Sequence, residues 1–202
     1  DKNDVESMTS AYLSRIIQNI HNVPLTGIDP RVANDDDATA VELSAVYTAL
    51  LTERPEKKNA DMAEWLRHEQ TGAKSSALVA LNDEKYIVLL GDPGSGKSTF
   101  VNFLTLCLAG ERLGIPQLSL AMLSSPLPFQ QEDENEQRWD HGFLMPVRVV
   151  LRDFAARGIN GKSQDLDGCV LWQFIVDEMG ALLAPFSDHL RKILLEKGGL
   201  IM

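Results

Sequence analysis

The sequence predicts an α/β domain in which helices flank a parallel sheet, preceded by a mainly helical segment. Three apolar runs predict the strands, at residues 85–90 (KYIVLL), 145–154 (MPVRVVLRDF) and 198–202 (GGLIM). The first run is continuously apolar, as expected for a parallel strand that is covered on both faces. Helical stretches separate the runs, and the alternation of strands with helices is typical of a parallel sheet.

Helices are predicted where apolar residues recur at intervals of three and four. Residues 10–20 show this spacing, with Ser7 and Thr9 as candidates for capping the helix start. We also expect helices at 61–70, 98–111, 170–184 and 187–198, and a short helix or turn at 75–81. In the helix at 98–111, the predicted buried side chains are Phe100, Phe103, Leu104 and Cys107. Residues 46–50 favour a strand, although their pattern also fits a helix.

The composition and charge of the chain argue against some classes of function. The 202 residues carry a net charge of −10, which argues against broad electrostatic binding of nucleic acid or of anionic membranes. No segment is expected to reach the roughly 18 apolar residues of a membrane span. The two cysteines, Cys107 and Cys169, lie in apolar stretches and are expected to be buried reduced thiols. These features predict a cytoplasmic protein.

The motif that carries chemistry is GDPGSGKST, between the first predicted strand and its helix. It matches the P-loop pattern G-x-x-x-x-G-K-[ST], which cradles phosphates. Glycines let successive backbone N–H groups point inward, and the following helix adds its N-terminal N–H groups and positive dipole end. The predicted cofactor-binding residues are Gly91, Asp92, Pro93, Gly94, Ser95, Gly96, Lys97, Ser98 and Thr99.

The side chains at the end of the motif have separate predicted roles. Lys97 is the candidate catalytic residue, because its mobile charge reaches the β- and γ-phosphates. Ser98 is the candidate metal ligand, because its hydroxyl can bind Mg²⁺. Thr99 is expected to contact the α-phosphate or to cap the helix. The motif therefore predicts a site for a nucleoside triphosphate with Mg²⁺.

Residues 86–109 resemble the first strand, Walker A loop and helix of a NACHT domain, a class of STAND signalling ATPases. Residues 145–158 (MPVRVVLRDFAARG) are similar to the second NACHT strand, and 194–202 (LLEKGGLIM) to the approach to Walker B. Residues 12–29 and 43–51 resemble the lead-in before many NACHT P-loops. The resemblance implies a lead-in at 1–80 and the incomplete N-terminal part of the P-loop NTPase sheet at 81–202.

For the whole protein, the resemblance implies a switch between ATP and ADP states. It also implies self-association, with a role in innate immunity or antiphage defence. In the family, the Walker B carboxylate follows the strand that 198–202 resembles, so we expect a fragment that hydrolyses ATP poorly. Lead-in residues 24–29 and 46–47 are candidates for the wall of the adenine pocket.

Two rival interpretations stay open. The chain can belong to another P-loop class, such as an AAA+ motor or a GTPase, or it can be a non-catalytic interaction module with an empty loop. Arg148 and Arg152 lie four residues apart on the second predicted strand, so they should point to one side. Either arginine can approach a phosphate, although structural ion pairs are the commoner role and Asp153 is adjacent. Residues 130–140 (QQEDENEQRWD) are predicted to form an acidic surface insertion.

Overall fold

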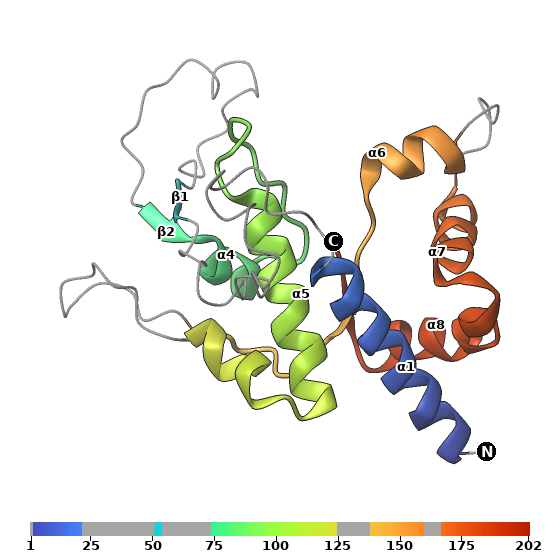
Figure 1. Cartoon of the computed structure of the whole chain (residues 1–202). Coiled ribbons are helices and arrows are strands. Elements are labelled where there is room, and N and C mark those ends of the chain that lie inside the picture. Colours follow the sequence, from blue (N-terminus) through green and yellow to red (C-terminus); the bar gives the residue numbers. More distant parts are fainter. Residues whose placement is uncertain (1, 22–50, 54–73, 125–137, 160–166) are drawn as a thin grey trace, which may run out of the picture.

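The computed structural model describes residues 2–21, 51–53, 74–124, 138–159 and 167–202 (Figure 1). Helices dominate these residues, and the strands are short. In chain order the elements are α1 (Lys2–His21), β1 (Leu51–Glu53), β2 (Lys74–Ser76), α4 (Ala77–Asp83), α5 (Lys97–Leu113), the 3-10 turns η2 (Pro116–Leu118) and η3 (Leu120–Ser124), β3 (Met145–Val147), α6 (Leu151–Asp153), the π-turn η4 (Phe154–Gly158), α7 (Gly168–Leu183), the 3-10 turn η5 (Ala184–Phe186), α8 (Ser187–Glu196) and β4 (Gly199–Ile201).

Strands β3 and β4 form a two-stranded parallel sheet. Met145 pairs with Gly199 and Val147 with Ile201, and the backbone N–H of Met202 donates to the Val147 carbonyl at 2.8 Å. The second and third predicted strands are therefore confirmed as parallel neighbours. Strands β1 and β2 pair antiparallel in a separate small sheet. The described residues are thus compatible with part of an α/β fold, in which the sheet is smaller than predicted.

The prediction of a strand at residues 85–90 is wrong. The segment carries no strand, and Tyr86 and Val88 are 85% and 82% exposed. Leu89 packs against the α4–α5 core together with Leu200. Only one side of the segment is covered, and none of the described residues pairs with it in a sheet. Continuous hydrophobicity predicts burial on two faces, but a strand also needs a neighbour for its backbone hydrogen bonds.

The second predicted strand, residues 145–154, is shorter than expected. Pairing ends where β4 ends, and Val149 makes the last backbone bond, to Met202. The Val150 carbonyl then accepts hydrogen bonds from the N–H groups of Asp153 and Phe154, so the chain turns into α6. The paired strand is therefore shorter than the apolar run, because the chain turns away from the sheet after Val150.

The helices at 10–20, 75–81, 98–111, 170–184 and 187–198 are confirmed within α1, α4, α5, α7 and α8. Helix α1 begins at Lys2, so Ser7 and Thr9 lie inside it and do not cap its start. The Thr9 hydroxyl instead donates to the Val5 carbonyl at 2.8 Å. The predictions for residues 24–29, 46–50 and 61–70, and for most of 130–140, lie outside the described residues.

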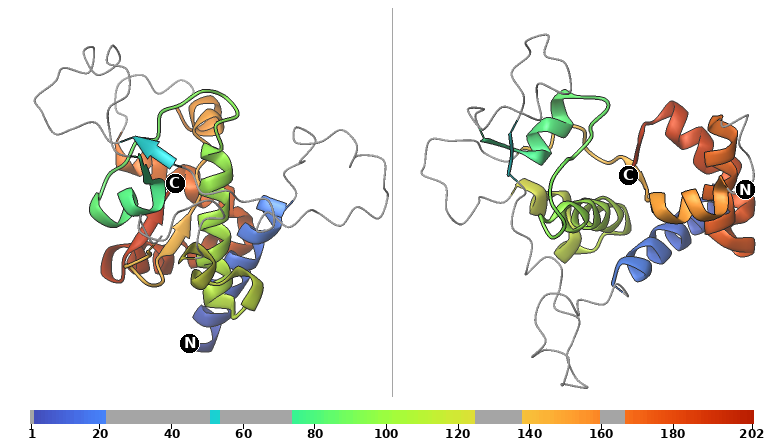
Figure 2. Two further views of the ribbon diagram at one scale, coloured as in Figure 1. Left: turned by 90° about the vertical axis from the view of Figure 1, so that its left-hand side faces the viewer. Right: turned by 90° about the horizontal axis from the view of Figure 1, so that it is seen from above.

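Helix α1 belongs to the core that surrounds the β3–β4 sheet. It packs against α5 on one side and against α7 and η5 on the other (Figures 1 and 2). Leu13 is fully buried, and the Tyr12 hydroxyl donates to the Pro146 carbonyl at 3.0 Å. Burial raises the pKa of Tyr12, so the hydroxyl stays a donor. The division of the chain at residue 80 stays a prediction.

A second core lies between α4 and α5. Phe100, Phe103, Leu104 and Cys107 are all buried there, as predicted. Burial raises the pKa of the Cys107 thiol to about 12, so this cysteine is an unreactive thiol at neutral pH. Cys169 is exposed in the first turn of α7, so its predicted burial is wrong. The apolar sequence around Cys169 packs through Phe174 and Ile175, on a different face of the helix.

Residues 168–196, which comprise α7, η5 and α8, are long and apolar enough to cross a membrane by length and composition. The expectation that no segment is long and apolar enough is contradicted by this finding, because Asp177 and Glu178 are the only acidic or basic residues between 168 and 187. Gly180 has φ 72° and ψ 168°, which breaks the helix within the segment. Met179 and Leu190 are buried in the core around the sheet. Packing inside the fold therefore uses part of this apolar surface.

Gly110 lies where α5 approaches η2, and Gly110→Ala is expected to destabilise the fold. A Cβ at Gly110 would lie 2.2 Å from the Leu118 carbonyl oxygen. The backbone of η2 must then shift, which should lower the free energy of unfolding by about 1–3 kcal/mol. Gly168→Ala is the matched control, because nothing lies within 4 Å of the added Cβ. Urea unfolding measures both variants, and equal stabilities would contradict the close contact.

Candidate phosphate-binding loop

The loop of residues 91–96 joins the extended segment 84–90 to the start of α5 (Figure 1). The backbone N–H of Ser95 donates to the Asp92 carbonyl at 3.2 Å, which closes a turn. Gly94 and Gly96 have φ values of 83° and 85°, in the left-handed region that favours glycine. A Cβ at Gly91 would lie 3.1 Å from the Ser95 hydroxyl oxygen. The motif glycines thus permit a tight loop.

The N-terminus of α5 is free of a side-chain cap. Gly96 occupies the N-cap position, and the first helical bond runs from the Phe100 N–H to the Gly96 carbonyl at 2.8 Å. The N–H groups of Lys97, Ser98 and Thr99 therefore lie in the first turn, where the helix dipole favours an anion. Thr99 lies within this turn, so the predicted capping role is wrong, and contact with a phosphate stays a prediction.

Lys97 folds back over the loop. Its ammonium nitrogen donates to the carbonyl oxygens of Gly91 at 2.6 Å and Asp92 at 2.8 Å, and to the Ser95 hydroxyl at 2.8 Å. All three N–H donors of the ammonium are therefore used by the loop. The positive charge lies among the residues that are predicted to surround the phosphates.

The remaining motif residues, Asp92, Pro93 and Ser98, are exposed. The Ser98 hydroxyl is thus open to solvent at the start of α5, which fits its predicted role as a Mg²⁺ ligand. Among the described residues, no three His, Cys, Asp or Glu side chains gather into a metal site. Mg²⁺ at a P-loop takes most of its ligands from phosphates and waters, so one hydroxyl fits such an ion.

Arg148 and Arg152 do not share a face, because β3 ends at Val147. Arg152 lies on α6, is 89% exposed and has a nitrogen 3.7 Å from Asp153, which is the predicted ion pair. Arg148 instead donates from Nε to the Asn102 side-chain oxygen of α5 at 3.0 Å. Sequence reasoning missed Asn102. The available signal was a polar residue within the apolar stretch 100–109, four positions after Ser98.

Comparison with known proteins supports the coarser interpretation of the motif. The chain is 25% identical over 184 residues to the energy-coupling factor transporter ATP-binding protein EcfA1 of Ureaplasma parvum serovar 3. The match covers 90% of this chain and 54% of that protein, so the chain spans about half the length of this relative. No protein-family model and no solved structure matches the chain. The similarity suggests a nucleotide-binding P-loop NTPase, and it lends no support to the NACHT or STAND class.

Proposed function

We propose that the chain binds ATP and ADP with Mg²⁺ through residues 91–99. The observation that carries this proposal is the position of the Lys97 ammonium, within hydrogen-bonding distance of three loop oxygens and beside the uncapped start of α5. A cation, a glycine-rich turn and free N–H groups together make an anion site. The similarity to an ATP-binding protein supports a nucleotide as the anion.

Binding then requires an exchange of hydrogen bonds at Lys97. The ammonium leaves the carbonyl oxygens of Gly91 and Asp92 and donates to phosphate oxygens. Both carbonyls lie in exposed residues, so water can replace the lysine at little cost in free energy. The bonds that are gained carry charge on both partners and are stronger. Ser98 is the residue that would hold Mg²⁺, through its hydroxyl. The ion would neutralise charge on the phosphates.

For the whole protein, we propose the ATP/ADP switch that the NACHT resemblance implies. The sequence resemblance of residues 86–109 and 145–158 supports this finer assignment. In the proposal, the nucleotide holds one of two arrangements, and self-association follows the change in arrangement. Action in the cytoplasm, in innate immunity or antiphage defence, belongs to the same proposal.

A second candidate is an ATP-binding component that turns over continuously, as the similarity to a transporter ATP-binding protein suggests. The two candidates differ in how fast nucleotide must leave. A switch stores its state, so it should retain nucleotide during purification. A component that turns over must exchange nucleotide and should be isolated largely empty, while it binds added Mg-ATP.

The deciding experiment is to purify the chain, denature it and chromatograph the nucleotide that is released. Stoichiometric ADP or ATP is the expected result and supports a switch. GDP or GTP would favour a GTPase. A protein that is empty and also fails to bind added Mg-ATP would contradict the proposed function and favour a non-catalytic module. Lys97→Ala is the control, because its preparation should contain less nucleotide per chain than that of the unaltered protein.

A further inference from the structure

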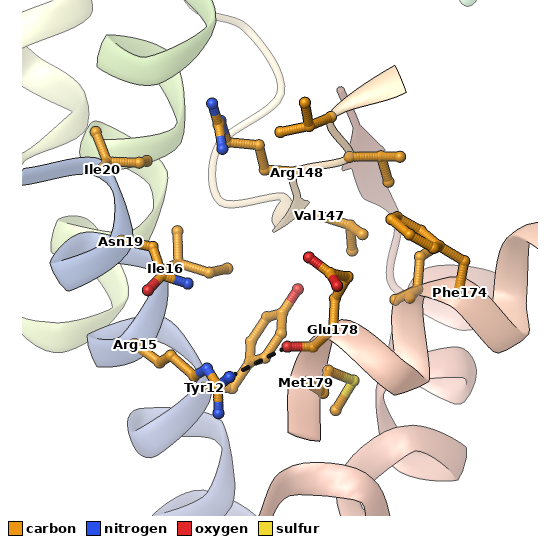
Figure 3. Close-up of a pocket in the computed structure, with 13 residues that line it drawn as sticks. Tyr12, Arg15, Ile16, Asn19, Ile20, Val147, Arg148, Phe174, Glu178 and Met179 are labelled. Atoms are coloured by element: carbon orange, nitrogen blue, oxygen red, sulfur yellow. Dashed lines mark hydrogen bonds between the residues drawn. The ribbon is translucent and has the colours of Figure 1, made fainter. Parts of the chain in front are cut away.

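A hollow lies between α1, the end of β3 with the residues that follow it, and α7 (Figure 3). Its volume is about 110 Å³, against the roughly 10–15 Å³ that one water molecule needs in the same measure, so it can hold a group larger than a water molecule. Aliphatic and aromatic side chains form most of the wall. The charged residues in the lining are Arg15, Arg148 and Glu178.

Arg148 is a half-buried cation without a carboxylate partner in the described part of the chain. Its Nε donates to the Asn102 oxygen at 3.0 Å, which holds the guanidinium in place, and Asn102 is only 8% exposed. A guanidinium has five N–H donors, and the structure describes a partner for one of them. A half-buried charge is unfavourable unless an anion or several acceptors satisfy it. Arg148 therefore has N–H donors with which it can bind an anion.

The other charged residues leave the hollow with an excess of positive charge. A Glu178 carboxylate oxygen accepts a hydrogen bond from Arg157 at 2.8 Å, which neutralises this acid. Arg15 donates to the uncharged backbone carbonyl of Glu178 at 3.3 Å. Figure 3 shows Arg15 and Arg148 on opposite sides of the hollow. This local positive charge occurs in a chain with a net charge of −10, so it favours an anionic ligand.

The hollow lies at the end of β3 and beside the residues that follow this strand. Val147 and Arg148 are at the carboxyl end of β3, and ligands of parallel sheets bind outside the carboxyl ends of strands. Asn102, which holds Arg148, follows Ser98 by four residues on α5. Residues at this spacing are neighbours on one helix face, about 5–6 Å apart at Cβ. Arg148 is thus linked to the helix turn that follows the proposed magnesium ligand.

We infer that Arg148 binds a phosphate group in this hollow, with Arg15 as a second cation on its far side. The inference rests on the proposed function, since the phosphate is either the γ-phosphate of ATP held by residues 91–99 or a free phosphate ion. A guanidinium suits both sources, because its planar fork matches two phosphate oxygens. In the first case, Arg148 distinguishes ATP from ADP.

The test compares Arg148→Gln with Arg152→Gln, an exposed arginine four residues away, in the whole chain. Mg-ATP and Mg-ADP are titrated into each protein by calorimetry, and inorganic phosphate is then titrated into the ADP-bound protein. If the γ-phosphate is the ligand, Arg148→Gln should weaken ATP binding roughly 10- to 100-fold and leave ADP binding unchanged. If free phosphate is the ligand, only phosphate binding should be lost. Arg152→Gln should match the unaltered chain throughout.

Unchanged ATP, ADP and phosphate affinities in Arg148→Gln would overturn the inference while leaving the proposed function intact. A chain that binds no nucleotide at all would instead overturn the proposed function, and titration of inorganic phosphate into the nucleotide-free chain and its Arg148→Gln variant would then decide the inference alone. Thermal unfolding checks that each variant is folded. If Arg148→Gln does not fold, Arg148→Lys replaces it, because lysine keeps the charge but lacks the fork. Full phosphate or ATP affinity in Arg148→Lys would exclude recognition by the guanidinium fork.

Discussion

Lys97→Ala is expected to weaken Mg-ATP binding by roughly 10- to 150-fold, measured by calorimetric titration. The ammonium lies among the loop oxygens of Gly91, Asp92 and Ser95, and we expect it to transfer to the phosphates when nucleotide binds. The lost interaction is a hydrogen bond between charged groups, which contributes about 1.5–3 kcal/mol. ADP should lose less affinity, because lysine reaches the γ-phosphate that ADP lacks.

Lys192→Ala on α8 is the matched control, because it removes an exposed lysine of equal charge outside the loop. Its ATP affinity should equal that of the unaltered chain. The three contacts of Lys97 lie at the surface, so Lys97→Ala should unfold at nearly the same urea concentration as the control. Unchanged ATP affinity in Lys97→Ala would show that residues 91–99 are not a nucleotide site in this chain.

The elements that the sequence predicts well are those with local signals. The spacing of apolar residues fixes α5 and α8, and the short apolar run after Gly198 fixes β4. The failure at 85–90 has a non-local cause. A hydrophobic run predicts that its side chains are buried. Strand formation depends in addition on a neighbouring segment whose backbone can pair with it. The early end of β3 is also not visible in its own sequence, since the apolar run continues while the chain turns into α6 after Val150.

The candidate site also has features that a local sequence pattern predicts and features that depend on the fold. The P-loop pattern identifies residues 91–99, because the pattern encodes backbone geometry within nine consecutive positions. It does not reveal that Lys97 bonds to the loop itself, which depends on a side-chain conformation. The hollow beside β3 combines Arg15, Arg148 and Glu178, which are far apart in the chain and share no motif. Only the packing of α1 and α7 around the sheet brings them together.

That packing makes α1 an element whose disruption should lower the stability of the fold strongly. Leu13 has no exposed surface, and its cluster includes Met145 and Val147 from β3 and Leu190 from α8. Leu13→Ala removes buried methyl groups from a site that several elements enclose, so a cavity should remain. We expect the free energy of unfolding to fall by about 2–5 kcal/mol in urea titrations. Leu182→Ala, at an 89% exposed helical leucine, is the control and should change it by less than about 0.5 kcal/mol.

The shape of the unfolding curve then shows whether the lead-in unfolds together with residues 81–202 or separately from them. If α1 is part of the same cooperative unit as α5 and α7, Leu13→Ala should shift a single transition that tryptophan fluorescence and circular dichroism report alike. A segment that folds by itself would instead produce a separate early transition and leave the main one in place. A single shifted transition would place the cooperative unit across the predicted boundary at residue 80. It would also show that α1 and α7, which hold Arg15 and Glu178 at the hollow beside Arg148, unfold together with the sheet.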